Sequence, residues 1–380
     1  MIRIPLTNEI LKSISAIDAY RFSVNTVKLQ PLTKNRLRKN SKKRSSYASN
    51  KIEGNPLTKK QADEAIERDP HKHFLKPEQE IRNYFLALGL LEEKAKQKEP
   101  FSRKMILEIQ AVVEKGASKE KIGLRGPMPP GVLFAVYDSE NRTPEYIPPE
   151  YCDIPDLLDE LVTYVNTTDD HPLIIAAVVH YQLVTIHPFE DGNGRTARLM
   201  SGYILDRYGY GFGGIGSLEE FFAYDPAEYY SSLQMGLPAL YYSGRNDPPH
   251  PEIWIRYFLK MMELYAGKVY ELSKRSESSD VEGSLSYLSA REKDFLALLL
   301  QKKLYEFAPI DVSRMLNVSN KTVINRCTTL ASHGFLIPKL VKTRIRSYQL
   351  SEFTKANEKK ILKWIGRSRP AHSNIPFSQT

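Results

Sequence analysis

Apolar residues recur every three or four positions along most of this chain, which is the period of an amphipathic helix. Several segments with this pattern follow Ser, Asp or Pro, as helix starts commonly do. They are residues 59–67, 77–96, 102–115, 155–167, 172–186, 195–208, 226–242 and 251–274. Residues 172–186 are apolar on almost every side, which predicts the buried central helix of a bundle. The pattern therefore predicts a mainly α fold.

One stretch departs from the helical period. Residues 132–147 (VLFAVYDSENRTPEYI) place two short β-prone runs on either side of a polar turn. This arrangement predicts a β-hairpin.

The last hundred residues follow a different order of elements. Residues 273–286 (SKRSESSDVEGSLS) are polar and Ser-rich, which predicts a linker. Beyond it we expect helices at 290–301, 310–316 and 321–333, a turn at 317–320, and strands at 335–338 and 348–350. A helix, a helix-turn-helix and a hairpin in this order predict a small winged helix-turn-helix domain over 287–380.

Composition adds limits to this picture. The 380 residues are 41% hydrophobic and 26% charged, as in an ordinary globular protein, and the length allows two domains. The longest apolar stretch, 172–186, is shorter than the roughly 20 residues of a spanning helix, so we expect no membrane partner. The two cysteines, Cys152 and Cys327, support neither a disulfide framework nor a thiolate metal site. With no recognisable signal peptide, we expect a cytoplasmic protein.

The net charge of +9 is unevenly distributed. Residues 281–380 contain 17 Lys and Arg against 7 Asp and Glu, so this part alone carries the excess. Such an asymmetry favours an acidic partner for the C-terminal domain, with nucleic acid the first candidate and a solvated basic surface the alternative.

The string HPFEDGNGRTAR at residues 187–198 carries the chemistry. Gly192 and Gly194 allow the backbone to curl and point successive N–H groups at one place, and a helix then begins at Arg195. A backbone nest followed by a helix N-terminus is an anion site suited to phosphate. Arg195 and Arg198 lie three residues apart, share a helix face and can hold outer phosphates.

Two further side chains of the string can act chemically. Asp191 is a carboxylate beside the nest, suited to Mg²⁺ that bridges two phosphates. His187 stands where the preceding helix ends before Pro188, and a histidine there can accept a hydroxyl proton near neutral pH.

The string fits the pattern HxFx(D/E)GNGRxxR at every fixed position, and the chain resembles a Fic-domain protein. The resemblance covers about residues 45–270. It includes a lead-in at 123–125, a flap hairpin at 131–147, and the YYSSL run with Tyr229 and Tyr230, which implies contact with the nucleotide base. Core packing is the alternative for these two tyrosines. The resemblance implies a Fic-type helical bundle with a β-hairpin flap as the catalytic domain, over 76–272, after an N-terminal helical region at 1–75.

The same resemblance implies protein adenylyltransferase activity. AMP would pass from ATP to a Tyr, Thr or Ser hydroxyl of a target protein, whose segment is added as a strand to the flap. The implied roles are proton acceptance by His187, Mg²⁺ binding by Asp191, and phosphate binding by Gly192, Asn193, Gly194, Arg195 and Arg198.

Residues 45–54 resemble the inhibitory helix of the family. Ser49 to Gly54 fit (S/T)xxxE(G/N), and the resemblance implies that Glu53 pairs with Arg198 and denies the γ-phosphate its place. An ordinary N-terminal helix with an exposed Glu is the alternative.

Other functions stay open at this level. The chain can be a DNA-binding regulator that acts through 310–346, with a Fic domain that modifies itself or removes AMP. The expected contacts are Ser319, Asn320, Lys321, Thr322, Asn325 and Arg326 in the second helix and Lys339, Lys342, Arg344 and Arg346 in the wing. A winged helix can also dock a protein, and a homodimer is compatible with the sequence. Transfer of phosphocholine or phosphate is a third reading, which the intact Asp191 disfavours.

Overall fold

The structure is a computed structural model that describes residues 1–117, 122–137, 143–341 and 344–367. The chain forms two compact units. The first contains Met1–Phe22 and Arg36–Val269, and the second contains Ser23–Asn35 and the chain from Tyr270 onward.

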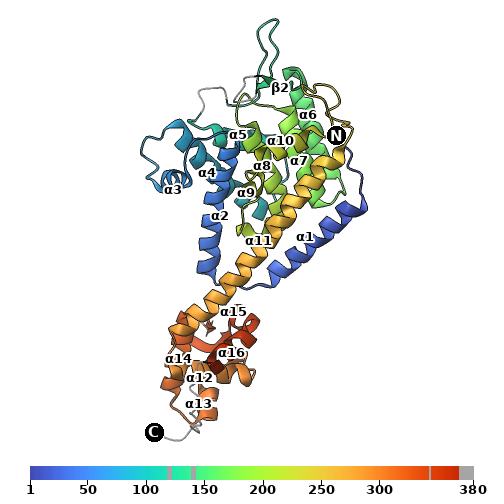
Figure 1. Ribbon diagram of the computed structural model, residues 1–380. Helices are drawn as coiled ribbons and strands as arrows, with labels where there is room; N and C mark the ends of the chain where they lie inside the picture. The colour runs from blue at the N-terminus through green and yellow to red at the C-terminus, as the bar shows by residue number, and fades with distance from the viewer. Residues whose placement is uncertain (118–121, 138–142, 342–343, 368–380) are drawn as a thin grey trace. The chain divides into compact units, whose positions relative to one another are not determined.

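The first unit is almost entirely helical (Figure 1). It is built from α1 (Asn8–Thr26), α2 (Pro31–Ile52), α3 (Lys59–Glu67), α4 (Lys76–Lys96), α5 (Arg103–Glu114), α6 (Ile154–Thr167), α7 (Pro172–Ile186), α8 (Asn193–Arg207), α9 (Glu219–Phe222), α10 (Pro226–Gln234) and α11 (Pro251–Ser286), with the 3₁₀ turns η1 (Tyr151–Asp153) and η2 (Phe212–Gly214). The boundary between the units falls inside α1, α2 and α11. The expectation of a mainly α fold is confirmed.

Helix α7 is the centre of the first unit. Every residue from Leu173 to Leu183 is buried, and the helix packs along α8 and against α6. Pro172 occupies the first turn, where its missing N–H costs nothing, and the His171 side chain caps the helix by accepting from the N–H of Leu173 at 3.3 Å. Trp254 of α11 donates from its indole to the Ala177 carbonyl oxygen at 2.9 Å. The predicted central helix is therefore confirmed in both bounds and burial.

The predicted hairpin is present as two short strands, β1 (Val136–Tyr137) and β2 (Pro144–Tyr146), paired antiparallel. The predicted turn between them falls largely outside the described residues. Tyr146 is buried and its hydroxyl donates to the Thr185 carbonyl oxygen of α7 at 2.5 Å. This contact fixes one strand of the hairpin to the helix that leads into the motif.

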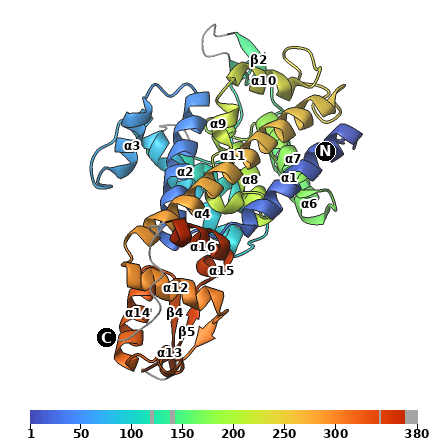
Figure 2. The same ribbon diagram turned by 60° about the horizontal axis from the view of Figure 1, so that its bottom comes forward.

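The second unit combines helices with a small sheet (Figure 2). Its elements in order are α12 (Ala290–Gln301), β3 (Glu306–Phe307), α13 (Pro309–Leu316), α14 (Asn320–Ser332), β4 (Leu336–Val341), β5 (Arg344–Leu350), α15 (Glu352–Ala356) and α16 (Glu358–Arg367). The strands form an antiparallel sheet in the order β3–β5–β4. Asn317 ends α13 in the left-handed region and Ser319 caps α14, so a tight turn joins the two helices.

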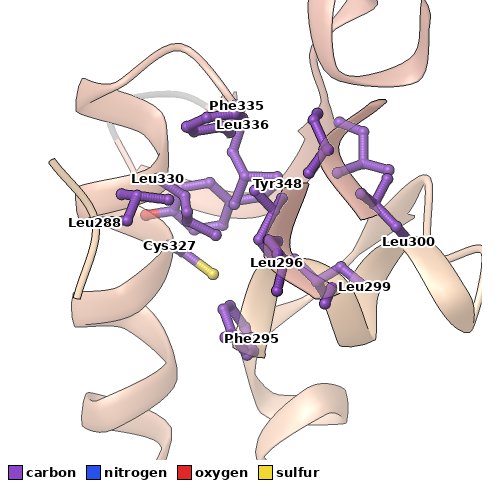
Figure 3. Packing of buried hydrophobic residues seen from close by; sticks show 14 of the residues in the cluster. Leu288, Phe295, Leu296, Leu299, Leu300, Cys327, Leu330, Phe335, Leu336 and Tyr348 are labelled. Atoms are coloured by element: carbon purple, nitrogen blue, oxygen red, sulfur yellow. The ribbon is translucent and has the colours of Figure 1, made fainter. Parts of the chain in front are cut away.

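A single apolar core holds this second unit together (Figure 3). Leu296, Leu299 and Leu300 of α12 face Cys327 and Leu330 of α14 and Tyr348 of β5, and all are essentially fully buried. Burial raises the pKa of the Cys327 thiol to about 12, so this cysteine is a packing residue.

Two sequence expectations need correction. Residues 273–286 are the last part of helix α11 instead of a linker, because Val281 and Leu285 lie on one helix face and are buried in the core of the second unit. Burial of that face outweighs the modest helix propensity of the serines. The helix expected over 226–242 ends as α10 at Gln234, because Met235 adopts a left-handed backbone and Gly236 follows with φ +78°.

Residues Ser23–Asn35, near the N-terminus, are also part of the second unit. Thr33 donates from its hydroxyl to Asp280 at 2.6 Å, and the Gln30 N–H donates to the same carboxylate at 3.1 Å.

Among the described residues, no helix is long and apolar enough to cross a membrane.

Candidate active site

Residues 187–192 of the string form the loop between α7 and α8, and residues 193–198 are the start of α8. The hydrophobic anchor of the loop is Phe189. This ring is fully buried, and Phe189 forms an isolated antiparallel bridge with Leu124. The Asn193 side chain accepts from the Phe189 N–H at 3.0 Å and donates to the Phe189 carbonyl oxygen at 2.9 Å. The resemblance implied that Asn193 binds phosphate. In this structure its side-chain amide makes hydrogen bonds to the backbone of Phe189, four residues earlier.

Both glycines of the motif are covered by carboxylates. Gly192 has φ +82°, and a Cβ there would lie 2.4 Å from Oε1 of Glu114. A Cβ on Gly194 would lie 2.3 Å from Oε1 of Glu53. A side chain at either position would therefore have to displace an acidic side chain, and at Gly192 the positive φ would add backbone strain.

His187 ends α7 in the left-handed region, with φ 48° and ψ 57°. Its Nδ1 lies 3.2 Å from the Val184 carbonyl oxygen, an arrangement in which Nδ1–H donates and Nε2 keeps its lone pair. Burial lowers the pKa of His187 to about 4, and the charge of Arg125 acts in the same direction. The imidazole is therefore neutral at pH 7 and able to accept a proton at Nε2.

Arg198 is held by the end of α2. Its Nε donates to the Ser49 hydroxyl at 2.8 Å, and its Nη2 donates to the Ser49 carbonyl oxygen at 3.0 Å and to Glu53 Oε1 at 2.6 Å. Burial by itself lowers the pKa of Arg198, and the carboxylate of Glu53 more than reverses this effect. The structure thus brings Ser49, Glu53 and Arg198 together as the sequence predicted.

The two tyrosines of α10 have different surroundings. Tyr229 is fully buried, and its hydroxyl lies 2.7 Å from His180 Nε2 and 3.5 Å from Arg198 Nη1. Tyr230 is 45% exposed and its ring centroid lies 4.9 Å from that of Tyr229. Tyr229 is thus part of the core beneath Arg198, and only Tyr230 presents a ring to an incoming molecule.

Arg195 is enclosed by carboxylates. Its Nη2 lies 3.0 Å from both Glu114 Oε1 and Asp191 Oδ1, and its Nη1 lies 3.7 Å from Glu80 Oε1. Glu114 is buried, and burial raises its pKa to about 7 against the opposing effect of Arg195. Arg195 therefore pairs with this acidic cluster, whereas Arg198 pairs with Glu53.

Asp191 uses one oxygen within the loop. Its Oδ1 accepts from the Gly192 N–H at 2.7 Å and from Arg195 at 3.0 Å, whereas Oδ2 lies 3.9 Å from Lys76 Nζ. The side chain is 35% exposed. The other carboxylate oxygen, Oδ2, thus takes no part in the hydrogen bonds within the loop.

The chain is similar in sequence to proteins of known family. Residues 100–205 match the model of the Fic/DOC family. The chain contains a Fic domain. The protein adenylyltransferase fic-1 of Caenorhabditis briggsae is 35% identical over 149 residues, which are 37% of this chain and 27% of that protein. Protein adenylyltransferase Fic of Aedes aegypti is 43% identical over 68 residues, 17% of this chain and 14% of the relative. The chain thus spans well under a third of these relatives.

Solved structures agree with the fold. A Fic family protein from Desulfovibrio desulfuricans G20 superposes with a TM-score of 0.58 at 19% identity, covering 93% of this chain and 98% of the other. Fic-1 (residues 134–508) from Caenorhabditis elegans gives a TM-score of 0.55 at 26% identity and covers 70% of this chain and 73% of the other. The expected Fic-type helical fold is confirmed.

Sequence reasoning missed three residues around the motif and the contact made by a fourth. Glu114, Glu80 and Lys76 come from α4 and α5, and no local pattern singles them out because each is one charge in an amphipathic helix. Arg125 was noticed only as part of the lead-in to the flap. Its side chain nevertheless contacts the backbone of His187.

The candidate contacts of the second unit are only partly free. Lys321 and Asn325 lie exposed on α14, whereas Arg326 lies over the Phe295 ring at 5.7 Å and Lys339 pairs with Glu306 at 2.7 Å. Of the other predicted contacts, Asn320 and Arg346 are exposed, and Ser319 and Thr322 form the cap of α14. Arg344 is the first residue of β5, and Lys342 lies outside the described residues.

Proposed function

We propose that the Fic domain is a protein adenylyltransferase that moves AMP from ATP to a Tyr, Thr or Ser hydroxyl of another protein. The observation that carries the proposal is the position of His187, which ends α7 just before the glycine nest with its Nδ1 against the Val184 carbonyl oxygen. With Nδ1–H donating there and the pKa lowered, Nε2 carries no proton and can accept one. The adenylyltransferase names of the relatives support the same reaction.

The transfer is a single displacement at the α-phosphorus. The target hydroxyl oxygen forms a bond to that phosphorus, the bond to the bridging oxygen breaks, and pyrophosphate leaves. The hydroxyl proton passes to Nε2 of His187, which is neutral beforehand. The N–H groups at the start of α8 supply fixed partial positive charge to the phosphate, so catalysis consists largely of positioning and electrostatic stabilisation.

Asp191 is the residue that fits Mg²⁺. Its Oδ2 has no hydrogen bond within the loop, and Mg²⁺ in nucleotide sites commonly takes one or two carboxylates together with phosphate oxygens and water. When bound, the ion neutralises charge on the phosphates. The described residues contain no group of three or more metal-binding side chains, so the nucleotide itself would have to complete the ligand set.

Glu53 is proposed as an inhibitory residue of this enzyme. Its carboxylate takes the Nη2 of Arg198 and covers Gly194, which are two groups that the outer phosphates of ATP need. ATP bound beside this carboxylate would meet a negative charge at its γ end. The α-phosphate would then lie out of line with the incoming hydroxyl.

The hairpin of β1 and β2 is the proposed docking place of the target, with 131–147 as the flap. Tyr146 anchors one strand to α7, and Tyr137 is 57% exposed on the other. An extended target segment can add to an exposed strand by backbone hydrogen bonds. Self-modification would require a segment of this chain, or of a second copy, to reach the same strand.

Incubation with ATP labelled on the α-phosphate tests the reaction. Glu53→Gly protein, alone and with cell lysate, should produce a labelled protein band that Glu53→Gly/His187→Ala protein does not. A band obtained only with ATP labelled on the γ-phosphate would instead indicate phosphate transfer. No band with either label would overturn the proposal.

A second candidate function is DNA binding by the C-terminal unit, here proposed as a winged helix. Exposed Lys321 and Asn325 on α14, and the excess of basic residues after 281, favour this function. Affinity for duplex DNA in the full chain should fall steeply with salt, since it would depend on phosphate contacts. Lack of binding to any duplex at low salt would favour a protein-docking role for this unit.

A further inference from the structure

Arg125 is a buried cation that joins separate segments around the motif. Only 5% of the residue is exposed. Its backbone N–H donates to the Pro188 carbonyl oxygen at 2.9 Å, and its Nε donates to the His187 carbonyl oxygen at 2.8 Å. Its Nη2 donates to the carbonyl oxygen of Pro149, in the segment that follows the flap hairpin. One residue therefore binds two consecutive carbonyls of the motif and the exit of the hairpin.

The segment that enters the hairpin lies on the same guanidinium. The Phe134 ring stands 4.7 Å from the guanidinium carbon of Arg125, a distance at which cation and ring attract. The same ring has its centroid 6.0 Å from that of His187. The two arms of the flap, meaning the segment that enters the hairpin at Phe134 and the segment that leaves it at Pro149, thus contact one side chain that also holds the motif.

His187 depends on such support because of its backbone. A non-glycine residue in the left-handed region costs about 1–2 kcal/mol, so surrounding contacts must hold it there. The carbonyl of His187 points to Arg125, and Nδ1 of its ring lies near Val184. The backbone bond and the ring bond together determine where Nε2 points.

We propose that Arg125 is a positioning residue that orients the imidazole of His187 and holds both arms of the flap at a fixed distance from it. The proposal deepens the adenylyltransferase function proposed above and rests on it for its kinetic part. A target segment added to the flap would reach the base at the right distance only while this guanidinium joins the two. The planar fork of arginine is needed because its nitrogens serve carbonyls in different segments at once.

The charge of Arg125 gives a separate observable. The groups that act on the His187 ring are Arg125, which lowers its pKa, and Glu53, Asp191 and the Val184 carbonyl, which raise it. Removing the cation should therefore raise the pKa of His187. Arg125→Lys keeps the charge and loses the fork, whereas Arg125→Met loses both.

Kinetics test the positioning role in a Glu53→Gly background. Arg125→Lys should lower kcat by at least about tenfold while KM for ATP changes by less than about twofold, because misplacement affects the transition state and not nucleotide binding. Arg125→Met should also move the acid limb of the pH–rate profile to higher pH. Arg103→Lys is the matched control, since Arg103 forms an exposed pair with Asp159 away from the motif, and it should leave both parameters unchanged.

Two measurements on the full chain need no transfer activity. By NMR, Arg125→Met should raise the pKa of the His187 ring, and Arg125→Lys should not. By hydrogen exchange, both variants should exchange faster in 132–137 and 144–149 than the parent. Should Arg125→Met fail to fold, Arg125→Lys and Phe134→Leu carry the test, and Phe134→Leu should speed exchange mainly in 132–137.

The outcomes separate the two proposals. Unchanged exchange in both arms, together with kcat of Arg125→Lys within about twofold of the parent, would overturn the role of Arg125. If Glu53→Gly protein transfers no AMP, the proposed function fails, and the titration and exchange results still decide whether Arg125 positions His187 and the flap.

Discussion

The carboxylate of Glu53 lies 2.6 Å from Nη2 of Arg198, across 145 residues of sequence. Arg198 is almost completely buried, whereas the Glu53 side chain is 31% exposed. A pair with one buried and one accessible partner can open from the Glu53 side without unfolding the bundle. Because the Glu53 carboxylate also lies over Gly194, it occupies the place that the phosphates of ATP would use.

Removal of this carboxylate should activate the enzyme. We expect Glu53→Gly to raise the transfer rate at saturating ATP by more than about tenfold, because Arg198 becomes free to hold the outer phosphates in the aligned pose. The measurement is the incorporation of α-phosphate label, with Glu53→Gly/His187→Ala as the blank. Equal rates at saturation would show that Glu53 does not inhibit, and a rise confined to low ATP would mean competition without misalignment.

Loss of the base should separate chemistry from binding. His187→Ala in the Glu53→Gly background should abolish transfer while the Kd for ATP stays within about threefold of the parent, since the imidazole is a proton acceptor and not a phosphate ligand. Calorimetric titration with ATP provides the binding arm. Transfer at the parental rate would rule out His187 as the base.

The carboxylate of Asp191 should determine the response to Mg²⁺. In the Glu53→Gly background, Asp191→Asn should abolish most transfer and remove the Mg²⁺-dependent part of ATP binding, because the amide offers no charge to the ion. Titrations of ATP with and without Mg²⁺ measure this part directly. An unchanged Mg²⁺ effect would mean that the ion is held by other groups.

The pH dependence follows from the lowered pKa of His187. The folded-state pKa of about 4 lies below the ordinary 6.5, so the ring stays neutral as the pH falls through 6.5 and becomes charged only near 4. The acid limb of kcat/KM for the Glu53→Gly protein should therefore lie well below pH 6.5. A limb at 6.5 or above would contradict a base whose pKa is lowered, and NMR titration of the ring gives the independent value.

Gly192 should be far less tolerant of a methyl group than Gly126. Gly192→Ala combines a positive φ with a collision at Glu114, and we expect the free energy of unfolding to fall by at least about 1–2 kcal/mol. Gly126→Ala meets nothing within 4 Å and serves as the control, with a change of less than about 0.5 kcal/mol. Similar Tm values for the two variants in thermal unfolding would contradict this reading of the nest.

The helical continuation of α11 can be tested through its anchor in the second unit. Leu285→Ala should lower the free energy of unfolding of that unit by about 2–5 kcal/mol, because Leu285 is fully buried in its core. Glu282→Ala, on the exposed side of the same turn, should change it by less than about 0.5 kcal/mol. Equal effects in denaturant unfolding would indicate that this part of α11 does not pack as described.

The sequence by itself determined the local features of this protein. Apolar residues at helical spacing marked α3 and α7 to the residue, since that spacing decides which face a helix can bury. The motif likewise predicted a glycine nest before a helix and a histidine at a helix end. Pro188 and the glycines favour those backbone shapes through short-range sterics, and the contact from Arg125 then helps to hold His187 in the left-handed region.

The tertiary structure alone decided the surroundings of Arg195, whereas the resemblance of residues 45–54 to an inhibitory helix already implied the pair of Glu53 with Arg198. Arg195 and Arg198 share one face of the helix, yet Arg195 faces Glu114, Glu80 and Asp191 and Arg198 faces Ser49 and Glu53. Glu80 and Glu114 come from separate helices, and a charge on an amphipathic helix carries no mark of what it will meet. The helical state of 273–286 was decided in the same way, because Val281 and Leu285 become buried only once the core of the second unit has formed around them.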